Sequence, residues 1–128
     1  MTTQFAYGNI TYIDGILHIE YYNGVLLDVS VFMNEIQCRK KLTGNDDFFL
    51  LLDMSKASDI TENALAFAAD HPFPENIKAI GVVTRPGNDH LRAKLYSVFD
   101  KPNIPTKAFL NAEDVKRWFD NLVNKKAA

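Results

Sequence analysis

The chain has 128 residues, of which 47% are hydrophobic and 23% are charged, a balance typical of a soluble globular protein. We expect a single domain spanning residues 1–128, because this length supports one hydrophobic core but not two. A net charge of −2 gives no general attraction to nucleic acid or to an anionic membrane, so neither is an expected partner.

The first third of the chain predicts a β-hairpin followed by a helix. Residues 9–13 and 16–22 are rich in Ile, Tyr and Leu, and an Asp-Gly turn separates them. The helix is expected to begin after a cap at Asp28 or Ser30, and to end near Leu42, because Gly44 can take the left-handed conformation at its end. Its expected buried stripe follows the helical period: Val29, Phe32, Met33 and Ile36.

The rest of the chain alternates between strands and helices. The run from Phe48 to Leu52 is apolar without alternation, which is typical of a strand covered on both faces. The expected elements are strands at 48–54, 78–84 and 104–109, and helices at 61–69, around 91–99 and from 111 onward. We therefore predict one α/β sandwich domain, with a mixed and mostly parallel sheet of about five strands, four helices and an N-terminal β-hairpin.

The strand–turn–helix in the middle of the chain resembles a known family. Asp53-Met54-Ser55 ends a strand, five residues of turn follow, and Thr61-Glu62-Asn63-Ala64-Leu65 opens a helix. STAS domains, the SpoIIAA-like anti-sigma-factor antagonists, carry Asp-Leu-Ser, a turn of the same length and Asp-Ser-Ser-Gly-Leu. The later strands and helices are similar to a divergent bacterial branch of this superfamily. The resemblance implies a SpoIIAA-like fold and a non-enzymatic regulatory module that binds a protein partner.

The resemblance also implies a phosphorylation switch, but this chain lacks its usual residues. The antagonists are phosphorylated on a serine at the helix start, and the two serine positions here hold Glu62 and Asn63. Thr61 occupies the aspartate position and offers a hydroxyl near a helix N-terminus, where a phosphate is electrostatically favoured. Thr61 is therefore the candidate phosphorylation site, and simple capping of the helix is the alternative interpretation.

We expect the partner-binding site at the carboxyl edge of the sheet, where open α/β sheets bind ligands and partners. The candidate residues are the polar side chains of the turn and helix start, bordered by the turn after the next strand: Asp53, Ser55, Ser58, Asp59, Thr61, Glu62, Asn63, Thr84 and Arg85.

Two other functions remain open from the sequence. A carrier or sensor of a small apolar ligand, of lipid-transfer type, would use the third helix as a lid through its apolar stripe: Leu91, Leu95, Val98 and Phe99. A small hydrolase-type enzyme would use Asp53 and Asp59 as an acid–base pair. No nucleophile elbow, phosphate loop or dinucleotide fingerprint accompanies these residues, so we predict no enzymatic activity.

Metal, cofactor and membrane sites are not expected. Cys38 is the only cysteine, and the histidines are not paired at ligand spacing. We expect His18, in a hairpin strand, to be an exposed or edge residue. No apolar run is long enough to span a bilayer and no signal peptide is evident, so we expect a cytoplasmic protein without stable membrane insertion.

Two clusters allow two interpretations each. Aromatic residues crowd the first hairpin, where we favour core packing over a homodimer interface: Phe5, Tyr7, Tyr12, Tyr21 and Tyr22. Basic residues surround the third helix, where we favour a solvated face over recognition of phosphates or of an acidic partner: Arg85, Arg92, Lys94, Lys101 and Lys107.

Overall fold

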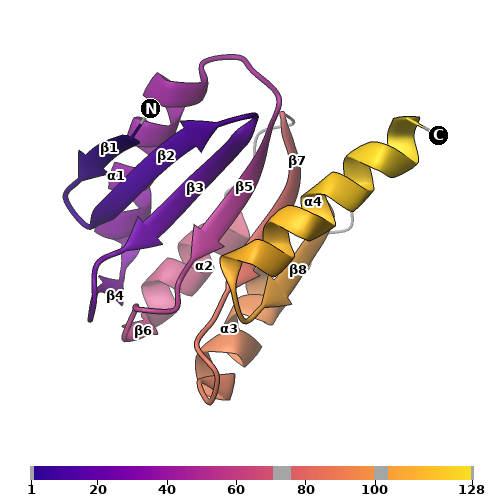
Figure 1. Ribbon diagram of the computed structural model, residues 1–128. Coiled ribbons are helices and arrows are strands. Elements are labelled where there is room, and N and C mark those ends of the chain that lie inside the picture. Colours follow the sequence, from indigo (N-terminus) through magenta and orange to yellow (C-terminus); the bar gives the residue numbers. More distant parts are fainter. Residues whose placement is uncertain (1, 71–75, 100–103, 128) are drawn as a thin grey trace.

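The computed structural model describes residues 2–70, 76–99 and 104–127, and within them six strands form one sheet in the order β1-β2-β3-β5-β7-β8 (Figure 1). The strands are β1 (Thr2–Phe5), β2 (Gly8–Ile13), β3 (Ile16–Tyr21), β5 (Phe48–Asp53), β7 (Ile77–Val83) and β8 (Thr106–Phe109). Two short strands, β4 (Leu26–Leu27) and β6 (Asp59–Ile60), pair with each other outside this sheet. The four predicted helices are α1 (Val29–Thr43), α2 (Glu62–Asp70), α3 (Asp89–Phe99) and α4 (Ala112–Ala127).

The sheet is mixed and mostly parallel, as predicted. Strands β1, β2 and β3 are antiparallel, whereas β3, β5, β7 and β8 run parallel to one another. The expected count of five strands is wrong by one, because β1 adds a sixth strand along β2. The segment Thr-Thr-Gln-Phe has a single large apolar residue, so its strand character comes from pairing with β2 and from burial of Phe5.

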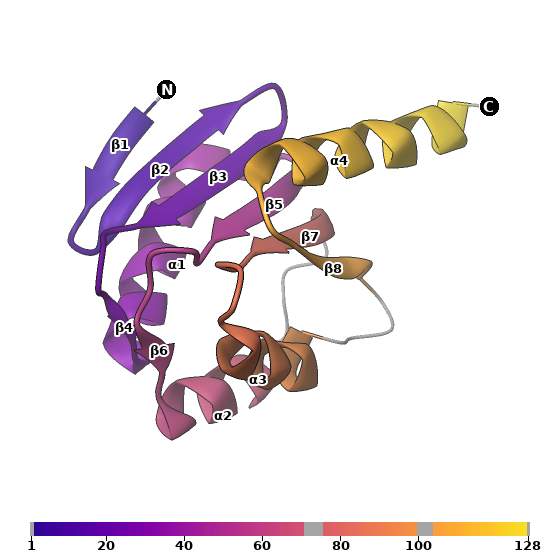
Figure 2. The ribbon, with the colours of Figure 1, turned by 60° about the horizontal axis from the view of Figure 1, so that its bottom comes forward.

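The helices form two unequal layers on the sheet (Figures 1 and 2). Helices α1, α2 and α3 cover one face, and α4 alone packs on the other, against β5, β7 and β8. The alternating side chains of β5 separate into the two layers: Leu50 and Leu52 join the larger core, and Phe49 and Leu51 join the smaller core beneath α4. Residues Phe48 to Leu52 are all buried, which confirms a strand covered on both faces.

Helix α4 approaches β7 closely because Gly81 has no side chain. A Cβ atom built at Gly81 would overlap the side chain of Val115, which is fully buried on α4. Phe119, one turn further along α4, stacks on Phe49 with ring centroids 4.7 Å apart. These contacts confirm the amphipathic pattern that predicted the last helix.

Helix α1 has the predicted ends but a different buried face. The Asp28 carboxylate accepts a hydrogen bond from the Val31 N–H at 3.1 Å, and Gly44 ends the helix with a φ of 55°. Met33, expected to be buried, is 51% exposed. The helix is rotated so that Glu35 and Arg39 face the core as an ion pair, with Nη2 and Oε2 3.2 Å apart.

The aromatic residues of the first strands contribute largely to the core beneath α1. Phe5 is 7% exposed and Tyr21 is 2% exposed, and their rings meet edge to face with centroids 6.1 Å apart. Tyr22 is 40% exposed. The homodimer through this region stays a prediction.

Candidate functional site

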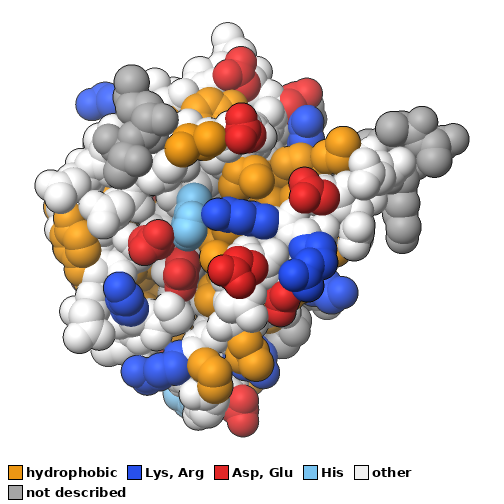
Figure 3. Space-filling model, viewed as in Figure 1, with side chains coloured by type: hydrophobic (Ala, Val, Ile, Leu, Met, Phe, Trp, Pro, Cys, Tyr) orange, Lys and Arg blue, Asp and Glu red, His pale blue; other side chains and the backbone are white. Residues whose placement is uncertain are grey.

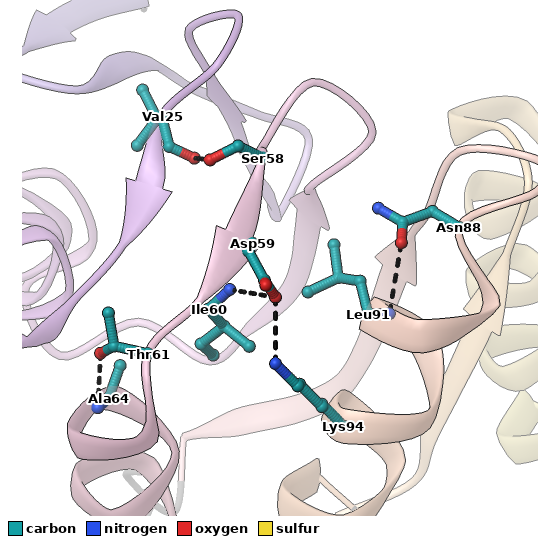
Figure 4. Close-up of polar contacts among 9 residues, drawn as sticks. All are labelled: Val25, Ser58, Asp59, Ile60, Thr61, Ala64, Asn88, Leu91 and Lys94. Carbon is teal, nitrogen blue, oxygen red and sulfur yellow. Dashed lines mark hydrogen bonds and ion pairs between the residues drawn. The ribbon is translucent and has the colours of Figure 1, made fainter.

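The predicted contact loop is fixed by backbone hydrogen bonds to the segment before α1. The Ser58 N–H donates to the Val25 carbonyl at 2.9 Å, and the Thr61 N–H donates to the Leu27 carbonyl at 3.0 Å. The Ser58 hydroxyl also donates to the Val25 carbonyl, at 3.2 Å (Figure 4). Together with the β4–β6 pairing, these bonds fix the conformation of the loop at the carboxyl edge of the sheet.

Thr61 caps α2, and its two exposed neighbours open the helix. The Thr61 Oγ1 atom accepts a hydrogen bond from the Ala64 N–H at 3.1 Å (Figure 4). Glu62 and Asn63, at the two positions where the antagonists carry serines, are both exposed. The start of α2 therefore presents a carboxylate and an amide to solvent.

Asp59 connects the loop to α3. One oxygen of its carboxylate accepts hydrogen bonds from the Ile60 N–H at 2.8 Å and from Lys94 Nζ at 3.2 Å (Figure 4). The Ile60 hydrogen bond and then Lys94 lower the pKa of Asp59, so the carboxylate is the favoured form. Asn88 caps α3 nearby by accepting from the Leu91 N–H at 3.3 Å. Polar side chains of the loop, of the start of α2 and of α3 thus lie at this edge. We call them the polar rim: Asp59, Thr61, Glu62, Asn63, Asn88 and Lys94.

Asp53 and Ser55 lie apart from this rim. The Asp53 carboxylate accepts from the Ser55 N–H at 3.0 Å and from its hydroxyl at 2.6 Å. In the β3–β5 register Asp53 lies beside Glu20, on the α4 face of the sheet, whereas Asp59 contacts α3 on the other side. The structure therefore does not bring Asp53 and Asp59 together as an acid–base pair.

Thr84 and Arg85 differ in accessibility. Thr84 is fully buried, its N–H donates to the Phe109 carbonyl at 3.0 Å, and its hydroxyl oxygen accepts from Arg92 Nε at 3.1 Å. Arg85 is exposed in the turn that follows. Thr84 is thus hydrogen-bonded within the protein, whereas Arg85 is accessible at the surface.

A second cluster of titratable side chains, not predicted from the sequence, surrounds His18 on the α4 face of the sheet. The side chain of His18 is only 17% exposed, and its Nε2 is 3.5 Å from Glu20 Oε1. Burial lowers the pKa of His18, whereas the nearby Glu20 and Asp53 carboxylates raise it and Lys116 of α4 lowers it. Figure 3 shows side chains of both charges gathered on this face of the molecule.

The error at His18 came from treating its strand as an edge. Strand β3 is interior, because β5 pairs along its second side, and residue spacing alone gives no signal for that pairing. Among the described residues, no three His, Cys, Asp or Glu side chains are placed to hold a metal ion. The helices in the described ranges include none with the length and apolar character required to cross a membrane.

The expected lid on α3 is only partly described. Leu91 and Leu95 are buried in the main core, whereas the side chains of Val98 and Phe99 lie outside the described part of the structure. Lys101, from the basic cluster, also lies outside the described residues.

Comparison with known proteins agrees with this architecture. An uncharacterized protein of the DUF3478 family from Shewanella loihica PV-4, described as having a SpoIIAA-like fold, superposes with a TM-score of 0.58 at 13% sequence identity. The match covers 92% of this chain and 94% of that one, and it confirms the SpoIIAA-like fold. No curated protein matches the sequence. The family model described as "Domain of unknown function (DUF7793)" matches residues 10–123, so the chain belongs to the DUF7793 family.

Proposed function

We propose that this protein is a non-enzymatic regulatory module of STAS type that acts by binding another protein. The observation that carries the proposal is the fixed loop with an exposed helix start at the carboxyl edge of the sheet. We name its exposed residues the loop face: Lys56, Ser58, Glu62 and Asn63. Arg85 lies at its border and is also exposed.

The fixed backbone favours recognition by contact. A loop already held by the Ser58 and Thr61 hydrogen bonds loses little conformational entropy when a partner binds, so more of the contact energy appears as affinity. Asp53, Ser55, Asp59 and Thr84 use their side chains in hydrogen bonds within the protein, so we expect them to contribute less to partner contact. Glu62 and Asn63 are the exposed groups at its helix start.

Thr61 is the proposed site of modification. Its oxygen accepts from the Ala64 N–H, so a phosphate on Thr61 would lie at the N-terminus of α2, where free N–H groups stabilise negative charge. The same phosphate would add negative charge beside Glu62, which changes the electrostatics of the loop face. A partner that binds this face would then be released or recruited by phosphorylation.

Native mass spectrometry of the protein purified gently from its own host tests the proposal. We expect a bound protein that is lost in Glu62→Lys and retained in Glu113→Lys, because Glu113 is also an exposed glutamate but lies on α4, away from the loop face. A partner that stays bound to Glu62→Lys contradicts the assigned surface. Recovery of a small apolar molecule in place of a protein contradicts the proposed function and favours a carrier.

A further inference from the structure

Strand β8 lies at one edge of the sheet (Figures 1 and 2), and two of its residues direct their backbone groups away from the sheet. The carbonyls of Pro105 and Phe109 accept hydrogen bonds of 2.9 and 3.0 Å from the β7 side. Alternate residues of a strand direct their backbone groups to the same side, so Lys107 also faces β7. Thr106 and Ala108 therefore direct their N–H and C=O groups to the open edge, where the described residues supply no strand.

A hollow lies beside this edge, between α3 and the ends of β7 and β8. Its apolar surface comes from Val82, Leu95 and Ala108, and the hydroxyl-bearing residues Thr84 and Thr106 complete the wall. The enclosed space is only about 10 Å³, close to what one water molecule needs. The hollow is therefore a shallow apolar depression that a side chain of a bound segment can lie over but not enter.

Two basic residues flank the hollow among the described residues. Arg92 and Lys107 contribute to its lining, and none of the described lining residues is acidic. Arg92 is held by its hydrogen bond to Thr84, and a carboxylate oxygen of Asp89, whose side chain is 87% exposed, is 3.8 Å from Nη1. Lys107 Nζ lies 5.7 Å from the centroid of the Phe109 ring, on the α4 side of the strand.

We propose that β8 and this hollow bind an extended segment of an acidic partner protein, which adds to the sheet beside β8. The outward backbone groups of Thr106 and Ala108 would pair with the segment, as in other cases of strand addition. Apolar side chains of the segment would lie over the hollow, and acidic side chains, on its opposite face, would lie beside Lys107. Arg92 attracts further carboxylates at the mouth of the hollow.

A second copy of the chain fits this edge less well. Pairing of two β8 strands about a twofold axis would bring Lys107 of each copy close together, because β8 is only four residues long. Lysine on an edge strand is a recognised means of preventing self-association. The surface is also separate from the loop face, so this proposal and the proposed function can fail independently.

Fluorescence anisotropy with labelled peptides of about six residues tests the proposal. The probe alternates Val and Glu, and the control peptide alternates Val and Lys. We expect the acidic peptide to bind and the basic one not to bind. Ala108→Pro removes an outward N–H without breaking the β7 ladder, so we expect it to weaken binding roughly tenfold or more while the thermal melt is retained.

Charge variants provide the matched control and do not depend on the proline variant folding. We expect Lys107→Glu to weaken binding of the acidic peptide roughly tenfold or more. Lys116→Glu, the same charge change on α4, should leave the affinity within about twofold of wild type. Equal binding of both peptides, no binding of the acidic one, or unchanged binding to Lys107→Glu would overturn the proposal. A dimer in light scattering that Ala108→Pro converts to a monomer would instead assign the edge to a second copy.

Discussion

Replacement of Arg39 by Leu should destabilise the protein strongly, because it leaves a buried carboxylate without its partner. The side chains of Arg39 and Glu35 are only 8% and 5% exposed, and their charged atoms are 3.2 Å apart. At an effective dielectric constant of about 20, the attraction at this distance is about 5 kcal/mol. The cost of removing both charges from water offsets much of it, so the intact pair adds little net stability.

Removing one partner of the ion pair and replacing both partners should have different effects on the free energy of unfolding. Loss of one partner costs about 3–5 kcal/mol, a large share of the roughly 5–15 kcal/mol that stabilises a domain. Glu35 Oε1 and Arg39 Nη1 are buried without hydrogen-bond partners, which makes the pair an incompletely satisfied one. The double replacement Glu35→Leu/Arg39→Leu should therefore recover wild-type stability or exceed it.

The loss of folding stability in Arg39→Leu should depend on pH. Burial raises the pKa of Glu35 and Arg39 lowers it, with burial the larger effect, so removal of Arg39 raises this pKa further. A carboxyl with a raised folded-state pKa is most stabilising when protonated, below its unfolded pKa of about 4.3, and this stability is lost as pH rises through the folded pKa. The variant should thus be weakest at neutral pH and recover on mild acidification.

Urea denaturation followed by far-UV circular dichroism at several pH values measures these effects. Glu35→Gln/Arg39→Leu is the matched control, since it lacks the titrating carboxyl and should show a flatter pH profile. The reasoning is refuted if Arg39→Leu is as stable as wild type at neutral pH. It is equally refuted if the double leucine variant is as unstable as Arg39→Leu alone.

Three further outcomes can be checked by thermal or chemical denaturation. Gly81→Ala should cost about 1–3 kcal/mol by overpacking, and adding Val115→Ala should recover part of the loss; a loss equal to the sum of the single changes would contradict the close contact. Thr61→Ala should cost about 1 kcal/mol through loss of the α2 cap, with Thr61→Ser close to wild type. Lys94→Met should cost less than about 1 kcal/mol, because Asp59 is 44% exposed; a larger loss would contradict this expectation.

The sequence predicted best the elements whose local pattern and tertiary environment agree. The uninterrupted apolar run of β5 requires cover on both faces, and the cap at Asp28 acts within one turn of its helix. Strand β1 was missed because its pairing with β2, and not its own composition, makes it a strand. The burial of Met33 was wrong because helical periodicity cannot anticipate an ion pair that occupies the core-facing side.

The position of the candidate loop in the fold was predicted, whereas its role as a binding site stays a prediction. The loop lies at the carboxyl edge of the sheet, as parallel topology requires. Which of its side chains face outward depends on hydrogen bonds to distant segments, such as those from Ser58 to Val25 and from Lys94 to Asp59. The separation of Asp53 from Asp59 depends on the pleat of β5 and the path of the loop, neither of which is visible in residue spacing.

Helix α4 holds the only tryptophan of the chain, Trp118, whose ring centroid lies 5.6 Å from that of Phe109. The helix packs on a small cluster of its own, separated by the sheet from the larger core beneath the other three helices. Indole fluorescence therefore reports whether this one helix is attached, whereas far-UV circular dichroism reports the backbone of the whole domain. The chain thus carries an intrinsic probe that can separate the release of α4, as a local cooperative unit, from global unfolding.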